Sequence, residues 1–355
     1  MKIGILTFHW ATNYGAVLQC YALQEYLKSL GHEVEIINYK PHLYDDNLFT
    51  FLRFRKLLHI GDYLNNRKKE AALVDFRNEH LHLTERIHAC KDIADIANRY
   101  DAIVSGSDQV VNPSFLLNGE GKGIVSPTYF LGFPFDGKRV GYALSFGCVT
   151  YPEDARKIAS NYLKDFDIIG VRENSGIEIV KSMGRNDAIV MPDPTVLQLP
   201  DFYHDIADKC TIQETRPYIY SYFIRHLEDR KLSINSLFRE ELVFWNNEDG
   251  DYTMQGWLSK IKKAAFVMTD SFHCVVMCLK FHKPFVAITE QKGNVGMNDR
   301  LYTLLERVGL SDNIVNKGQL NNIDTFRESS INWAQTDSIM GELHNSIDSL
   351  LSRLN

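Results

Sequence analysis

Short apolar runs alternate with amphipathic segments along the chain, which is the pattern of an α/β protein. Apolar residues dominate 2–8 and 33–39, and between them leucines recur with helical spacing over 18–30. Gly31 follows the last of these leucines and suits a helix stop. This order of strand, helix and strand predicts a βαβ unit of the doubly wound kind, with parallel strands.

The same alternation continues in two blocks. Further strands are predicted at 102–105, 140–145, 168–172 and 188–191 in the first block, and at 218–224, 242–245, 265–269 and 285–289 in the second. A charged and mainly helical segment at 41–99 interrupts the first block, and we expect it to cover one edge of the first sheet.

Three prolines between positions 192 and 200 mark a domain boundary. We therefore expect a first Rossmann-like domain at 1–196, which includes the insertion, and a second at 197–332. An amphipathic helix at 333–355 is expected to cross back to the first domain. The predicted fold class is α/β, with two Rossmann-like domains in a GT-B-like arrangement and a ligand cleft between them.

Composition excludes several classes of protein. The net charge of −6 over 355 residues argues against a nucleic-acid binder. Six cysteines without the spacing of a disulfide framework indicate reduced thiols. The first residues lack the pattern of a signal peptide, and there is no apolar run of about 18 residues. These features together predict a cytoplasmic protein.

The polar segment after the first strand opens a helix, and backbone N–H groups at a helix start suit an anion or a hydroxyl-rich ligand. It is not a GxGxxG motif and no acidic partner for a ribose follows, so a nucleotide cofactor is not expected. An ordinary polar connection is the alternative interpretation. The candidate residues here for binding an acceptor are His9, Asn13, Tyr14, Gly15 and Gln19.

Two other strand ends carry candidate residues. Ser107, Asp108 and Gln109 follow Gly106 and offer the hydrogen-bonding surface that a sugar needs, although helix capping would also explain them. Arg172 ends another strand and would grip a phosphate or carboxylate. An ion pair is the alternative interpretation for an arginine in that place.

Asp270, Ser271 and His273 cluster at a strand-to-helix turn of the second block. A histidine there suits proton transfer to a bound anion, while a structural histidine is the alternative. The helix that follows carries Cys274 and Cys278 at helical spacing, and core packing explains them better than a zinc site.

Basic residues supply two further candidates. Lys292 and Arg300 flank a glycine-bearing loop and would complete an anion pocket with His273, unless they are solvated charges. A basic stretch at 53–69 within the insertion would touch an anionic membrane surface, although a solvated helix face is the simpler interpretation.

Taken in order, these segments resemble the polysaccharide pyruvyl transferase family. The matching motifs are Asn13-Tyr14-Gly15, Ser105-Gly106-Ser107-Asp108-Gln109, Tyr142-Ala143-Leu144-Ser145-Phe146-Gly147, Val171-Arg172-Glu173, Asp193-Pro194-Thr195, Thr269-Asp270-Ser271-Phe272-His273 and Leu304-Leu305-Glu306-Arg307-Val308-Gly309-Leu310. Each motif alone is weak, whereas the ordered set extends over most of the chain.

The resemblance implies a GT-B-like fold and phosphoenolpyruvate as the donor substrate, with neither a further cofactor nor a metal. The donor-binding arginine of the family looks like Arg172 and its key histidine like His273. Arg300 looks like a later basic residue, with Lys292 as the fallback. Many members have an arginine two residues before the histidine, where this chain has Ser271.

The implied reaction moves the enolpyruvyl unit onto a sugar of an exopolysaccharide, a capsule or a lipid-linked precursor, and closes a pyruvate ketal. Either Asp108 or Asp270 would accept the proton of the sugar hydroxyl. The enzyme would work in the cytoplasm, at the inner face of the membrane if its acceptor is lipid-linked. The alternatives are a nucleotide-sugar glycosyltransferase of the same architecture and a non-catalytic glycan-binding relative.

Overall fold

The computed structural model describes residues 1–45, 60–118, 123–210, 214–225, 227–238, 241–289, 295–316, 326 and 331–351. The chain divides into two compact units, of which the first runs from Met1 to Pro194 and the second begins at Thr195. The sequence pattern places this boundary two residues later, between 196 and 197. Each unit is an α/β structure with its own parallel sheet.

A six-stranded parallel sheet forms the centre of the first unit, in the order β2-β1-β3-β4-β5-β6. Its strands are β1 (Lys2–Leu6), β2 (Glu33–Ile36), β3 (Ala102–Asp108), β4 (Lys138–Leu144), β5 (Ile168–Val171) and β6 (Ile189–Val190). The order reverses beside β1, which pairs with β2 on one side and with β3 on the other. The loops after β1 and β3 therefore flank the switch point, where parallel α/β sheets bind ligands.

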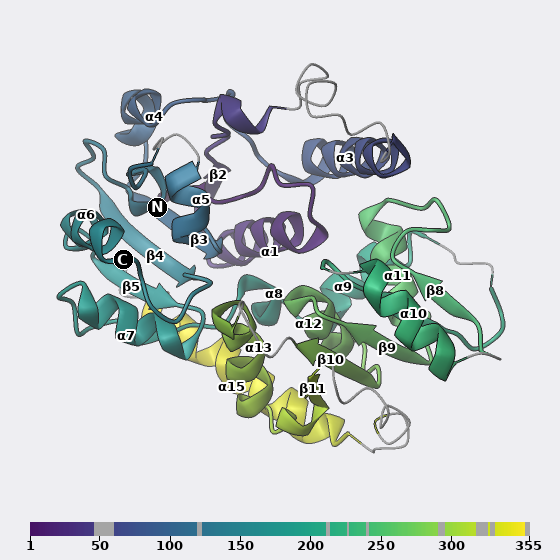
Figure 1. The fold of residues 1–355 in the computed structure, drawn as a ribbon. Helices are drawn as coiled ribbons and strands as arrows, with labels where there is room; N and C mark the ends of the chain where they lie inside the picture. Colours follow the sequence, from purple (N-terminus) through teal and green to yellow (C-terminus); the bar gives the residue numbers. More distant parts are fainter. Residues whose placement is uncertain are drawn as a thin grey trace. The chain divides into compact units, whose positions relative to one another are not determined.

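The helices of the first unit lie around this sheet (Figure 1). They are α1 (Tyr14–Ser29), η1 (His42–Tyr44), α3 (Ile60–His80), α4 (Cys90–Ala97), α5 (Pro113–Asn118), η3 (Thr128–Phe130), α6 (Glu153–Leu163) and α7 (Asn174–Ser182). The Asn13 side chain caps α1 by accepting a hydrogen bond of 3.3 Å from Ala16 N. Gly31 follows α1 with φ of 85°, which fits the predicted stop.

The inserted segment is less helical than its sequence predicts. Residues 82–87 run extended along the free edge of β2, where Ile36 N donates to His82 O at 2.7 Å and Ile87 N donates to Asn38 O at 2.9 Å. This extended stretch is short and lies between two helices, so the sequence pattern around it is mainly helical. A strand at a sheet edge can be this short because it needs only a few backbone hydrogen bonds. The insertion thus extends the sheet at the edge that it was expected to cover.

The second unit holds a five-stranded parallel sheet in the order β11-β10-β9-β7-β8. Its strands are β7 (Ile219–Tyr222), β8 (Val243–Trp245), β9 (Phe266–Thr269), β10 (Phe285–Thr289) and β11 (Ile314–Asn316). All the predicted strands of both units are present, and β11 is one that the sequence pattern misses. Here β7 lies between β8 and β9, so the switch point is flanked by the loops after β7 and β9.

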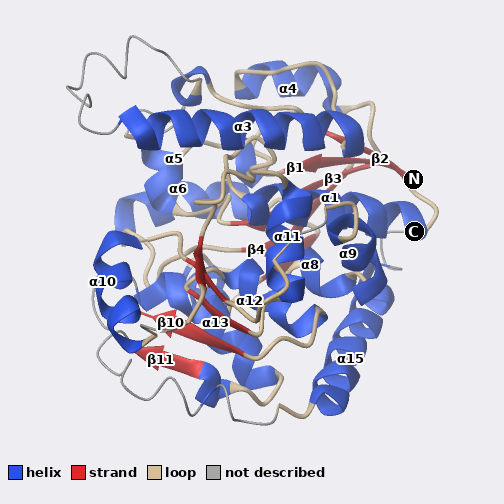
Figure 2. Ribbon diagram, turned by 90° about the vertical axis from the view of Figure 1, so that its right-hand side faces the viewer, coloured by secondary structure: helices blue, strands red, loops and turns tan. Residues whose placement is uncertain are grey.

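Helices pack around the strands of the second unit as well (Figure 2). They are α8 (Pro194–Leu197), α9 (Pro200–Ala207), α10 (Leu227–Leu237), α11 (Met254–Lys263), α12 (Phe272–Lys280), α13 (Val295–Arg307), η4 (Ser311–Asn313) and α15 (Trp333–Leu351). Among the described residues, no helix is both long enough and apolar enough to cross a membrane. The return of the last helix to the first domain and the GT-B-like cleft stay predictions.

Gly106 is required by the close approach of β3 and β4. Its φ is +111°, and a Cβ atom at this position would collide with the carbonyl oxygen of Tyr142 in the neighbouring strand. We expect Gly106→Ala to lower the free energy of unfolding by roughly 2–5 kcal/mol, through left-handed strain and overpacking. Gly184→Ala is the matched control, since Gly184 has φ of +92° with no atom within 4 Å of the added Cβ. Denaturant unfolding of both variants measures the difference, and equal losses would contradict this account.

Candidate functional site

At the switch point of the first unit, buried hydrogen bonds connect the loop after β1 to the end of β3. Thr7, which follows β1, donates a hydrogen bond of 2.9 Å from its hydroxyl to Ser107 O. The Gln19 amide on α1 donates in turn to the Thr7 hydroxyl at 2.9 Å. These side chains are buried, so the hydrogen bonds fix the loop after β1 against the end of β3.

Arg172, at the end of β5, lies among three carboxylates. Its Nη1 donates to Asp193 Oδ2 at 2.9 Å, its Nη2 lies 3.4 Å from Asp108 Oδ1, and its Nε lies 3.9 Å from Glu173 Oε2. The Arg172 side chain is only 1% exposed. The neighbouring carboxylates raise its pKa against the opposing effect of burial, which keeps the guanidinium charged.

The same carboxylates tie the surrounding loops to Arg172. Asp193 Oδ2 also accepts from the Ser107 hydroxyl at 3.0 Å, and Glu173 Oε1 accepts from Phe146 N at 2.7 Å. Burial raises the pKa of Glu173, and Arg172 opposes that effect. One arginine facing three acids gives a cluster without positive excess, so the ion-pair interpretation of Arg172 describes this arrangement. Its role toward an anionic donor stays a prediction.

Most of the residues predicted to bind the acceptor are engaged within the protein. Asn13 is the cap of α1, and the Gln109 amide oxygen accepts from Asn112 Nδ2 at 2.8 Å. Tyr14, Gly15, Gln19 and Ser107 are buried. Asp108 differs from them because its side chain is 16% exposed and its φ is 75°, which turns the chain away from the strand. Asp108 is therefore the predicted residue in this unit that presents a carboxylate toward solvent.

His9 is buried beside β1, with an acceptor oxygen near each ring nitrogen. Its Nδ1 lies 3.2 Å from Thr7 O and its Nε2 lies 3.0 Å from Asn38 Oδ1. Burial lowers the pKa of His9 to about 4 and outweighs these two acceptors, which favour protonation. A neutral, buried ring fixes the start of the loop after β1.

An aromatic recess lies just beyond the carboxyl end of β1. The Phe8 ring meets the Tyr129 ring edge-on at 4.9 Å, and the Trp10 ring lies 4.8 Å from the Tyr44 ring. Small-molecule sites are commonly lined in this way, by aromatic side chains with few polar groups. The lining residues are Phe8, Trp10, Tyr39, Pro41, Tyr44, Phe115, Leu116, Ser126 and Tyr129.

In the second unit, the Asp270 carboxylate joins the loops on the two sides of the switch point. It accepts hydrogen bonds from Ile224 N at 2.7 Å and from Arg225 N at 3.1 Å, both in the loop after β7. Arg230 on α10 completes the set, with Nη1 at 3.0 Å from Asp270 Oδ2. Burial raises the pKa of Asp270, while Arg230 and the two backbone donors counteract that rise. These contacts make Asp270 a structural anchor.

Ser271 begins α12 as its cap residue. Its hydroxyl accepts from Cys274 N at 3.3 Å, and its own N–H donates to the Thr269 hydroxyl at 3.0 Å. His273 therefore lies in the first turn of a nine-residue helix, where the helix dipole is positive. The His273 side chain is buried at 6% exposure, with its ring edge-on to Phe272 at 5.3 Å.

Two buried arginines lie next to this helix start. Arg300 on α13 is predicted from the sequence, and its guanidinium lies 5.9 Å from the centre of the Phe272 ring. Arg230 is missed by sequence reasoning, because the charged run around it looks like a solvated helix face. Its side chain is 1% exposed, and its guanidinium lies 4.6 Å from the Phe223 ring. Lys292 lies outside the described residues.

The start of α12 is therefore electropositive. Arg230, Arg300 and the positive end of the helix dipole gather around it, and the Asp270 carboxylate pairs with Arg230. Buried arginine and a helix start are the groups that bind phosphate and carboxylate best. Cys274 and Cys278 are buried in the same helix, as core packing predicts.

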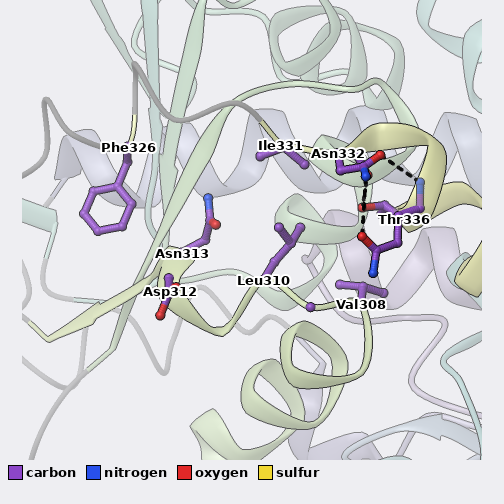
Figure 3. Close-up of a pocket in the computed structure, with 10 residues that line it drawn as sticks. Val308, Leu310, Asp312, Asn313, Phe326, Ile331, Asn332 and Thr336 are labelled. Carbon is purple, nitrogen blue, oxygen red and sulfur yellow. Dashed lines mark hydrogen bonds between the residues drawn. The ribbon is translucent and has the colours of Figure 1, made fainter.

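Two larger pockets of the second unit lie elsewhere. One, of about 430 Å³, is lined by residues from the end of α13, from η4 and from the start of α15 (Figure 3). Asn313 in this pocket donates to Phe285 O at 2.9 Å, and Phe285 is the first residue of β10. The pocket thus lies at the amino edge of the sheet. The other, of about 380 Å³, lies at the carboxyl end of α12 beside Lys280. Neither adjoins the switch point, so the charged cluster at the start of α12 is the better candidate site.

Folding lowers the pKa of His9 from 6.5 to about 4. Between pH 4 and pH 6.5 the unfolded chain therefore binds one proton more than the folded chain. Stability is therefore full above pH 6.5, and about 3 kcal/mol of it is lost as the pH falls to 4. We expect His9→Gln to flatten the dependence of unfolding free energy on pH in this window. His82→Gln, at an exposed histidine, is the control and should keep the slope of the unaltered protein. A His9→Gln slope equal to that of the control would refute the assignment.

Comparison with known proteins gives one family. Residues 13–292 match the family model of polysaccharide pyruvyl transferase. No curated protein matches the chain.

The chain is also similar to solved structures at low identity. A protein described as a UDP-N-acetylglucosamine 2-epimerase from Listeria monocytogenes has 11% identity and a TM-score of 0.49, over 96% of this chain and 90% of that one. E. coli ADP-heptose lipopolysaccharide heptosyltransferase II has 13% identity and a TM-score of 0.38, over 96% and 99%. The glycosyltransferase of kitacinnamycin has 13% identity and a TM-score of 0.42, over 100% and 99%.

The family model covers well over half of the 355 residues, and it includes Asn13, Arg172 and His273, whereas Arg300 lies beyond its end. The chain therefore belongs to the polysaccharide pyruvyl transferase family.

Proposed function

We propose that the protein transfers the enolpyruvyl unit of phosphoenolpyruvate to a sugar of a polysaccharide, or of its lipid-linked precursor, and closes it as a pyruvate ketal. Family membership supplies the reaction class. The observation that carries the proposal is the electropositive start of α12, where buried Arg230 contacts Asp270 and buried Arg300 lies beside Phe272, in the turn that holds His273. A donor that carries both a phosphate and a carboxylate requires such a surplus of positive charge.

The roles at the start of α12 follow from the contacts there. Arg300 would bind an anionic group of the donor, and the Ser271 hydroxyl and the first turn of α12 would orient that group. Arg230 would act through Asp270 as a positioning residue, because its Nη1 pairs with that carboxylate at 3.0 Å. Many family members have an arginine where this chain has Ser271, and Arg230 would supply a second guanidinium to that turn instead.

His273 would serve as the proton donor. In the proposed reaction, the imidazolium protonates the methylene carbon of phosphoenolpyruvate, which leaves positive charge on the carbon that bears the phosphate oxygen. One sugar hydroxyl attacks that carbon, a second hydroxyl closes the ring, and inorganic phosphate departs. The sugar loses two hydroxyl protons, the methylene gains one, and the leaving phosphate takes up the other. The scheme uses no group beyond the donor and the protein side chains.

Of the two carboxylates considered as the base, Asp108 suits the role better. Asp270 already accepts from two backbone N–H groups and pairs with Arg230, so its oxygens are engaged. Asp108 is partly exposed and has a longer contact of 3.4 Å to Arg172. Arg172 would then act on the acceptor side by fixing Asp108, in addition to the donor role that the family resemblance implies.

The aromatic recess after β1 has a volume of only about 20 Å³, so its rings would contact the acceptor at the rim and would not enclose it. Aromatic faces pack on sugar rings, and Trp10 and Tyr44 lie at the loop whose residues are predicted to bind the acceptor. An acceptor linked to a lipid would bring the protein to the membrane face. The exposed Arg67 and Lys68 on α3 fit such a contact, whereas the more N-terminal basic residues of the stretch lie outside the described residues.

Titration calorimetry of phosphoenolpyruvate tests the donor site. We expect Arg300→Ala to raise the dissociation constant roughly 10- to 100-fold, which corresponds to the loss of hydrogen bonds to a charged group. The control is Arg216→Ala, at an exposed arginine paired with Glu214. Arg172→Ala is a poor choice here, because it would leave three carboxylates without their cation and unfold the loops.

The outcomes of this titration separate the competing functions. Binding of nucleotide sugars in place of phosphoenolpyruvate would contradict the proposal and favour a glycosyltransferase. If neither phosphoenolpyruvate nor a nucleotide sugar binds, with or without glycan present, the result would favour a non-catalytic glycan-binding protein. Equal affinities in Arg300→Ala and the unaltered protein would remove Arg300 from the site.

Proton donation by His273 makes a kinetic prediction. His273→Gln keeps a hydrogen-bonding side chain of similar reach but cannot donate a proton at neutral pH, so we expect kcat to fall roughly 10²- to 10⁴-fold. The dissociation constant for phosphoenolpyruvate should change much less than kcat. Phosphate release in the presence of an acceptor measures the rate. A variant with unaltered kcat would show that His273 is structural.

A further inference from the structure

Three candidate metal ligands lie together at the edge of the first unit. His42 and Asp45 belong to the segment after β2, and His88 follows the extended stretch that runs along that strand. One donor atom from each residue lies within 4.8 Å of the others. Two imidazoles and a carboxylate are the ligand types that zinc takes in open sites, where water fills the remaining position.

Backbone hydrogen bonds hold the two segments in register. Lys40 N donates to Ile87 O at 2.9 Å, and Ile87 N donates to Asn38 O at 2.9 Å. The turn of η1 then brings Asp45 back over His42, since Asp45 N donates to His42 O at 3.0 Å. The ligand-bearing positions are therefore set by the fold, and an ion need not order the chain to bind there.

The side-chain contacts fit metal ligation. His88 Nδ1 lies 2.9 Å from Lys40 O, and because a carbonyl only accepts, Nδ1 carries the proton and Nε2 keeps its lone pair. His42 Nδ1 lies 3.1 Å from Asp45 Oδ2. A tetrahedral zinc with bonds of 2.0–2.1 Å would hold two ligand atoms about 3.3 Å apart. His42 Nδ1 and Asp45 Oδ2 would therefore move only slightly if zinc replaced the proton between them.

The two imidazole rings are stacked, with their centres 3.7 Å apart and their planes 13° apart. An ion bound in the plane of both rings requires one of them to tilt. The His42 side chain is 75% exposed, so its rotation meets little resistance. Lys40 opposes cation binding, because its Nζ lies 3.6 Å from Asp45 Oδ1. The site should therefore bind more weakly than a buried zinc site.

From this geometry we infer that His42, Asp45 and His88 bind a zinc ion that links the segment after β2 to the segment after residue 87. The inference is independent of the proposed transferase activity, because none of these residues takes part in the reaction scheme. It also differs from the zinc site considered for the helix of Cys274 and Cys278. The bound ion would stabilise the sheet edge beside the aromatic recess.

Calorimetric titration of zinc chloride into the metal-stripped full-length chain tests the inference. We expect one ion per chain, and a loss of affinity of at least tenfold in His42→Ala, His88→Ala and Asp45→Asn, each ligand replaced by a residue that cannot bind the ion as well. His82→Ala is the matched control, because His82 is an exposed histidine of the same insertion, and it should bind as the unaltered protein does. Lys40→Met should tighten binding roughly fivefold by removing the competing charge.

A second measurement guards against effects on folding. Zinc at a fixed concentration should raise the Tm of the unaltered protein and of His82→Ala, and should raise the Tm of His42→Ala by much less. Circular dichroism of each variant without metal checks that the fold is kept. Absence of zinc binding in the unaltered protein would overturn the inference. So would binding that persists in the His42→Ala/His88→Ala double variant, which would instead point to the partly exposed thiols of Cys148 or Cys210.

Discussion

The buried carboxylate of Asp270 is the contact on which the candidate donor site depends. It accepts hydrogen bonds from Ile224 N and Arg225 N and forms an ion pair with the Arg230 guanidinium, and so joins the loop after β7 to the turn that begins α12. A buried carboxylate with a single partner would be costly, but two backbone donors and one ion pair stabilise it and fix the loops around it. Ser271 can then cap α12, and His273 occupies the electropositive first turn.

The first unit also has a buried ion that fixes the surrounding loops, but with the charges reversed. There Arg172 is the buried centre, and Asp108, Asp193 and Glu173 surround it. Each unit thus places one buried, paired ion at the carboxyl edge of a parallel sheet, and the adjoining loops are bonded to it. The balance of charge differs, with an acidic surplus in the first unit and a basic surplus in the second. This difference suits a hydroxyl-bearing acceptor on one and an anionic donor on the other, as proposed.

The fold was largely predictable from local pattern, whereas the site was not. Strands that are buried on both faces appear in the sequence as apolar runs. The α/β class follows from the alternation of these runs with helices. Side-chain pairing depends instead on strand order, which places Arg172 against Asp108, 64 residues away. For the same reason Arg230 looks like one charge among many on a helix, although the sheet brings it to Asp270, where it is 1% exposed. His273 and Arg300 were found through the family resemblance and the turn before α12.

The transfer itself is the most direct test of this account. The protein would be incubated with phosphoenolpyruvate and a pool of bacterial oligosaccharides, with phosphorus NMR to follow the donor and mass spectrometry to follow the glycans. The account predicts that one inorganic phosphate appears for each glycan that gains the mass of pyruvate less one water. Phosphate release without that gain, or glycan extension that requires a nucleotide sugar instead, would contradict it.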